Sequence, residues 1–133
     1  MGEPALIPGI ELIYRGMRQA KWVQGGIVNY LAYMLRPATA QFPEPETELS
    51  VALTTEKAVG GLSKYYGIAG LSVEQVHALR YHLAVRSDPT DELLAAIHGL
   101  PLHSYDEVQI GLAIAAATDL AAISPLVPMA MPQ

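Results

Sequence analysis

Arg15 is the residue whose type and position are best suited to bind a ligand, because it ends a short apolar run and precedes Gly16. A guanidinium at a strand end can hold a phosphate or carboxylate through two parallel hydrogen bonds, and an adjacent glycine lets the ligand approach the backbone. No acidic residue occurs between Arg15 and Arg36. An anionic ligand is therefore expected near this segment, and the alternative is a solvated basic loop. The predicted ligand-binding residues are Tyr14, Arg15, Gly16, Arg18 and Lys21.

Ser50 and Glu107 are the other candidates for chemistry. Ser50 lies in an alternating apolar stretch without the Gly-x-Ser-x-Gly pattern of a nucleophile elbow, so it is either a hydrogen-bonding group for a ligand or an ordinary strand serine. Glu107 follows Asp106 at an expected helix start, where the helix dipole favours acids and where Ser104 and Glu107 match a capping box. Both residues therefore have a structural interpretation beside the chemical one.

Metal binding is not expected from this sequence. The four histidines, His77, His82, His98 and His103, do not form an i, i+4 pair or an HExxH motif. The chain also has no cysteine, which excludes disulfides and thiolate ligands and is compatible with a cytoplasmic location.

The charge distribution argues against nonspecific binding to nucleic acid, because the formal net charge is −5. The first residues lack a basic segment followed by an apolar run, so no signal peptide is expected. The most apolar window, residues 108–123, contains Gln109 and Asp119. We therefore expect a buried core helix there, or one face of a homo-oligomer contact, and not a membrane span.

The elements that must position these residues form one α+β domain over residues 1–124. We expect a short mixed sheet with strands near 10–15, 48–53 and 81–86, packed on a buried alanine-rich C-terminal helix over 105–123. Helices are also expected over 27–35, 56–66 and 73–80, whereas residues 91–97 form either a short helix or a loop that feeds a strand. Residues 42–46 are expected to be an extended acidic loop, and residues 125–133, with three prolines, an extended tail.

The stretch Leu12-Ile13-Tyr14-Arg15-Gly16 resembles the first-strand motif of the ADP-ribosyltransferase superfamily. The resemblance extends loosely through Phe42, the run from Leu49 to Thr55 and the helix expected from Glu56. It implies that NAD is the cofactor, that Arg15 orients its phosphates, and that Ser50 and Glu107 are the other catalytic residues. The Ser-Thr-Ser run of the family is absent, and no Glu-x-Glu or Gln-x-Glu closes the chain.

Two functional hypotheses follow. The first is an ADP-ribosyltransferase-like domain that binds NAD or another anionic nucleotide and acts as the toxin of a bacterial toxin–antitoxin pair, with the antitoxin as its partner. The second is a non-catalytic interaction subunit of a larger assembly that uses its apolar last helix and proline-rich tail. The chain also resembles small bacterial proteins with a strand ending in Tyr-Arg and a later Leu-Ser-Val strand, and that resemblance implies no activity.

Overall fold

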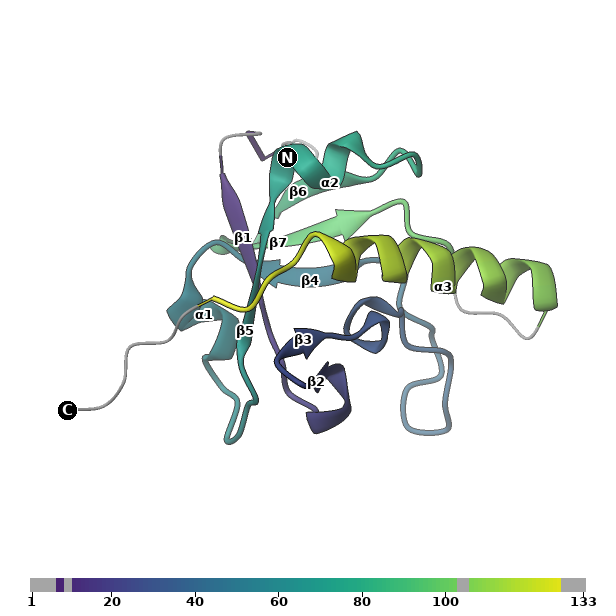
Figure 1. The fold of residues 1–133 in the computed structure, drawn as a ribbon, viewed down its shortest axis with the longest axis horizontal. Helices are drawn as coiled ribbons and strands as arrows, with labels where there is room; N and C mark the ends of the chain where they lie inside the picture. The colour runs from purple at the N-terminus through teal and green to yellow at the C-terminus, as the bar shows by residue number, and fades with distance from the viewer. Residues whose placement is uncertain (1–6, 9–10, 103–105, 128–133) are drawn as a thin grey trace.

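The computed structural model describes residues 7–8, 11–102 and 106–127 and has an α+β fold, as the sequence predicts (Figure 1). A five-stranded sheet with the order β5-β1-β4-β7-β6 crosses the middle of the domain, and all of its described strand pairs are antiparallel where a mixed sheet was expected. Its strands are β1 (Leu12–Gly16), β4 (Leu49–Ala52), β5 (Ile68–Ser72), β6 (Ala84–Asp88) and β7 (Asp91–His98). The strand β1 is interior to the sheet, so a residue at its end lies between two neighbours.

The region expected to be a helix over 27–35 is instead the second strand of a small hairpin, followed by a 3₁₀ helix. The hairpin joins β2 (Val23–Gln24) to β3 (Ile27–Val28) through Gly25 and Gly26, whose φ angles of 61° and 77° suit glycine. The 3₁₀ helix η1 (Ala20–Trp22) precedes the hairpin, and η2 (Tyr30–Tyr33) follows it. The prediction was wrong because the glycine pair makes a tight turn and the apolar residues after it do not continue one helical face.

The helices are shorter than the sequence pattern indicates. The helix α1 (Thr55–Val59) is capped by Thr54 and ends at Gly60, and not near Gly67, because Gly61 adopts a φ of 85°. The helix α2 (Val73–Ala78) is capped by Ser72 as predicted.

The long C-terminal helix α3 (Glu107–Ala122) begins two residues later than expected. Its N-cap is Asp106, whose carboxylate accepts hydrogen bonds from the backbone N–H groups of Val108 and Gln109. The capping box predicted from Ser104 is thus replaced by an aspartate cap, and Ser104 itself lies outside the described residues.

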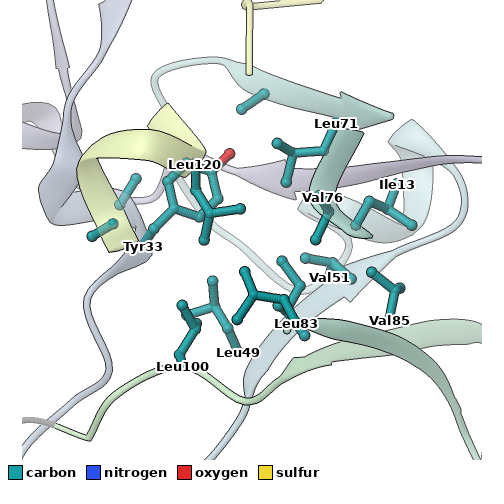
Figure 2. Close-up of a cluster of buried hydrophobic side chains, with 14 of the residues drawn as sticks. Ile13, Tyr33, Leu49, Val51, Leu71, Val76, Leu83, Val85, Leu100 and Leu120 are labelled. Carbon is teal, nitrogen blue, oxygen red and sulfur yellow. The ribbon is translucent and has the colours of Figure 1, made fainter. Parts of the chain in front are cut away.

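The hydrophobic core lies between one face of the sheet and the helices α2, η2 and α3 (Figure 2). Strand alternation directs Ile13, Val51 and Val85 to this face, where Val76 of α2 and Leu120 of α3 meet them. The helix α3 is buried only along the side that carries Ala113, Ala116, Ala117 and Leu120. The core therefore fixes the sheet face from which Arg15 projects.

Both outer strands of the sheet bond to other parts of the chain. Along β5, Gly70 donates its backbone N–H to Pro125 and Val127 donates to Ile68. At β6, Val85 donates its N–H to the imidazole of His77 and accepts a bond from the N–H of Ile7. Residues 125–127 of the expected tail therefore lie against the sheet, as extended chain, while residues 128–133 are outside the described part.

No helix in the described ranges is both long enough and apolar enough to cross a membrane.

Candidate functional site: a basic pocket at the end of strand β1

Arg15 lies on the core face of β1, where alternation also buries Ile13 and Met17. Its side chain is 8% exposed. Here β1 diverges from β4: the described register between them is the single pair of Tyr14 with Ala52. The guanidinium fills the gap, because Nη1 donates to the Ser50 carbonyl at 2.7 Å and Nε donates to the Ala32 carbonyl at 2.6 Å. Arg15 thereby ties β1 to β4 and to η2.

The positive charge of Arg15 is stabilised by carbonyl dipoles and an aromatic ring. Burial lowers the pKa of Arg15 to about 10, so the side chain stays protonated at neutral pH. The carboxylates of Asp91 and Glu48 form ion pairs with Lys57 and His98, and neither of them pairs with Arg15. The guanidinium instead lies 5.0 Å from the centroid of the Trp22 ring, and that of Arg18 lies 5.2 Å from it.

Two pockets meet at Arg15, Arg18 and Trp22. The larger one, called here the basic pocket, has a volume of about 420 Å³ and is lined in addition by Lys21, Arg36 and Glu46. The smaller one, called here the sheet pocket, has a volume of about 140 Å³ and is lined in addition by Tyr14, Gly16, Ser50 and Lys57. All four basic residues of the acid-free segment thus line one pocket, with Glu46 as its one carboxylate among the described lining residues. Its size is within the range of ordinary small-molecule sites.

The four cations of the basic pocket are not equally free to bind. Arg15 uses Nε and Nη1 on backbone carbonyls. The Arg36 guanidinium donates to the carbonyls of Pro37, Phe42 and Glu44, so it organises residues 37–46. Arg18 and Lys21 are both exposed, and they are the side chains that can turn toward a ligand at the smallest cost.

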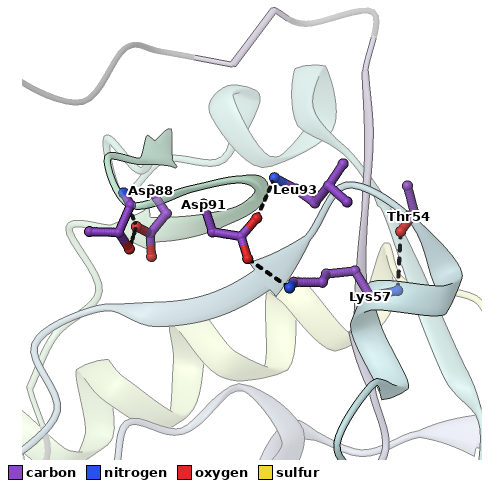
Figure 3. A network of polar contacts seen from close by, with 6 residues as sticks. Thr54, Lys57, Asp88, Asp91 and Leu93 are labelled. Atoms are coloured by element: carbon purple, nitrogen blue, oxygen red, sulfur yellow. Dashed lines mark hydrogen bonds and ion pairs between the residues drawn. The ribbon is translucent and has the colours of Figure 1, made fainter.

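Lys57 in the sheet pocket already has a partner (Figure 3). Its ammonium lies 2.7 Å from an Asp91 carboxylate oxygen, and its own backbone N–H donates to the Thr54 hydroxyl that caps α1. Asp91 also accepts a hydrogen bond from the N–H of Leu93, and the contact with Lys57 lowers the pKa of Asp91. Lys57 therefore joins α1 to β7, and most of its charge is compensated.

The predicted site residues divide into two groups. Tyr14, Arg15, Gly16, Arg18 and Ser50 line the sheet pocket, and Arg15, Arg18 and Lys21 line the basic pocket. Ser50 contributes its backbone carbonyl to Arg15. Glu107 lines neither pocket; it is exposed in the first turn of α3. The predicted set of catalytic residues is therefore brought together only in part.

Trp22 and Glu46 are among the residues of the basic pocket that sequence reasoning missed. Trp22 is the single tryptophan of the chain and directly follows Lys21, so an aromatic residue among cations was a usable signal. Glu46 is distant from the strand in sequence. Its position depends on reciprocal bonds with Arg36, in which the Glu46 N–H donates to the Arg36 carbonyl and the Arg36 N–H donates to Glu46 Oε1.

The histidines lie elsewhere. His77 accepts the bond from Val85, and His98 contacts a Glu48 carboxylate oxygen at 2.9 Å. His82 has a φ of 57° in the turn before β6, and His103 lies outside the described residues. In the part of the chain that the structure describes, no three histidine, aspartate or glutamate side chains gather as metal ligands.

Comparisons with known proteins add no family: no family model, no curated protein and no solved structure matches this chain.

Proposed function

We propose that this domain binds a small anionic nucleotide, of which NAD is the first candidate, in the basic pocket. The observation that carries the proposal is the convergence of Arg15, Arg18, Lys21 and Arg36 with Trp22 around one pocket. These four are half of the eight Lys and Arg residues in a chain of net charge −5. A local cationic field in an acidic protein draws anions to that end of the molecule.

The parts of the pocket have distinct roles in this proposal. Arg18 and Lys21 contact the phosphates, since charge-assisted bonds are the strong ones. Arg15 holds β4, η2 and Trp22 in place, and its buried positive charge adds to the attraction for the ligand. The sheet pocket, with the Tyr14 ring and Ser50 in its lining, offers polar groups to an uncharged portion of the ligand. The transferase reaction and the toxin role stay predictions. For the reaction, the predicted catalytic carboxylate, Glu107, lines neither pocket.

Isothermal titration with NAD and with ADP tests the binding proposal. Arg18→Ala and Lys21→Ala each remove one charge-assisted bond to phosphate and are expected to raise Kd about tenfold. Arg80→Ala is the matched control, because Arg80 is exposed, contacts Tyr81 and is not among the residues that line either pocket. Equal Kd values for all four proteins, or no heat for the wild type, would remove the proposal.

The second candidate function, a protein-interaction subunit, is favoured by one specific observation. The helix α3 exposes Val108 and Leu112 one turn apart on the same side, with Val108 69% exposed, and Ile114 on another side. Light scattering of the wild type and Leu112→Glu would test it, because an oligomer built on this side would dissociate in the variant. A wild type that is monomeric at high concentration would count against a homo-oligomer.

A further inference from the structure

The basic pocket already contains an anion of its own. The carboxylate of Glu46 lines it together with the four cations, and its Oε1 accepts the backbone N–H of Arg36 at 2.6 Å. No Arg or Lys nitrogen of the described residues lies within ion-pair distance of this carboxylate. The charge of Glu46 therefore faces the cations without being neutralised by direct contact.

The segment that carries Glu46 is held together by its own hydrogen bonds. Its two ends are joined by the reciprocal bonds between Arg36 and Glu46. Between them, the Arg36 guanidinium holds three backbone carbonyls and lies 4.6 Å from the centroid of the Phe42 ring. Residues 38–45 are exposed throughout, and in Figure 1 the segment projects away from the sheet. A segment with so little burial opens at low cost in free energy.

We propose that Glu46 is an internal counter-anion of the basic pocket, which a ligand must displace or outweigh before it binds. This inference rests on the proposed anion-binding function of the pocket. An incoming phosphate gains attraction from Arg18 and Lys21 but is repelled by Glu46, so the carboxylate subtracts from the affinity for every anion. A ligand with several negative charges gains more from the four cations than one with a single charge, so it can more readily offset the cost of displacing Glu46.

Displacement of Glu46 has a structural consequence. When its carboxylate leaves, the Arg36 N–H loses this acceptor, and one of the two bonds that close the base of the segment is lost. Binding and opening of residues 37–46 are then coupled in free energy. The Arg36 amide therefore reports directly on whether the carboxylate has left.

Titration with inorganic pyrophosphate tests the proposal with two charge-matched variants. Glu46→Gln keeps an oxygen acceptor for the Arg36 N–H and removes the charge, and is expected to lower Kd by about tenfold or more, as for the loss of one like-charge contact. Glu44→Gln changes the net charge equally on the same segment, but its exposed side chain is not part of the pocket lining. Its Kd is expected to stay within about twofold of the wild type, because solvent and salt screen it.

The outcomes distinguish the counter-anion role of Glu46 from the anion-binding function of the basic pocket. If the wild type binds pyrophosphate and Glu46→Gln matches Glu44→Gln, the counter-anion role is overturned while the anion site stands. If neither the wild type nor Glu46→Gln binds, the proposed function falls and the inference falls with it. If Glu46→Gln binds and the wild type does not, both are supported. Hydrogen exchange at the Arg36 amide should change when the wild type is saturated with pyrophosphate, and an unchanged rate would contradict displacement of the carboxylate.

Discussion

Two arginines organise two different regions of this molecule, and each does so by donating to backbone carbonyls. Arg15 lies inside the sheet and bonds the carbonyls of Ala32 and Ser50, which are 17 and 35 residues away. Arg36 lies at the surface and bonds carbonyls within its own segment. Both also lie against an aromatic ring. The chemistry is the same, but Arg15 joins distant elements and Arg36 shapes a local turn, so the two should differ in their effect on stability.

The largest effect is expected at Arg15. Arg15→Met leaves the buried Ala32 carbonyl and the partly buried Ser50 carbonyl without their donor. It also removes the cost of burying a charge, and the net loss in unfolding free energy is about 2–4 kcal/mol. Urea denaturation followed by circular dichroism measures it. An unfolding free energy equal to that of the wild type would show that the two carbonyl bonds do not hold β1, β4 and η2 together.

A smaller effect is expected at Arg36. Arg36→Met removes bonds that are partly solvated, so the unfolding free energy should fall by about 1 kcal/mol or less. Local order should decrease more than global stability. The Thr39 N–H donates to the Phe42 carbonyl and the Phe42 N–H to the Thr39 hydroxyl, and both amides should exchange faster with solvent. A loss of stability as large as that of Arg15→Met would remove the contrast between the two regions.

The prediction of these regions from sequence succeeded where local chemistry decides. Alternation around Ile13 and Val51 identified β1 and β4, and Ser72 with Gln75 identified the start of α2. Residues 91–98, rich in Leu and Ala, have little intrinsic strand preference, and β7 forms because β4 and β6 pair with it on both sides. The glycine pair at 60–61 ends α1 within the helix predicted over 56–66, and the pair at 25–26 forms the turn of a hairpin that the pattern did not predict.

The candidate site, like the fold, was predictable from sequence only where local chemistry decides. The position of Arg15 at the end of an interior strand follows from the pattern, as does the basic character of its surroundings. Its partners do not, because the Ala32 carbonyl belongs to η2 and the Ser50 carbonyl to β4, and only the folded chain brings them to Arg15. The place of Glu46 depends on the closure of the Arg36 segment, for which residues 37–46 give no local signal.

The smallest effect on stability at neutral pH is expected at Tyr33, which lies in the core close to Leu120 (Figure 2). Its hydroxyl is buried without a hydrogen bond of normal geometry, although the nearby Ser124 side chain lowers the Tyr33 pKa and so partly offsets the effect of burial. Tyr33→Phe should therefore change the unfolding free energy by about 1 kcal/mol or less.

The alkaline range should separate the Tyr33 variant from the wild type. Burial raises the pKa of Tyr33 to about 12, against an ordinary value of 10. The unfolded chain therefore loses this proton first, and the wild type loses stability as pH rises from about 10 towards 12. Tyr33→Phe lacks this contribution and should lose less over that range. Identical alkaline slopes in denaturation at several pH values would contradict the burial of the hydroxyl.

The central claim, that the basic pocket binds an anionic nucleotide, is tested most directly at Trp22. Because Trp22 is the single tryptophan of the chain and lies where the two pockets meet, its indole N–H gives one assignable resonance at the site. In a ¹⁵N-labelled sample titrated with NAD, we expect this resonance to shift in a saturable way, and to shift less at the same ligand concentration in Arg18→Ala. Two results would contradict the account. In the first, the indole resonance does not move while ligand-dependent shifts occur on α3; in the second, no resonance shifts at all.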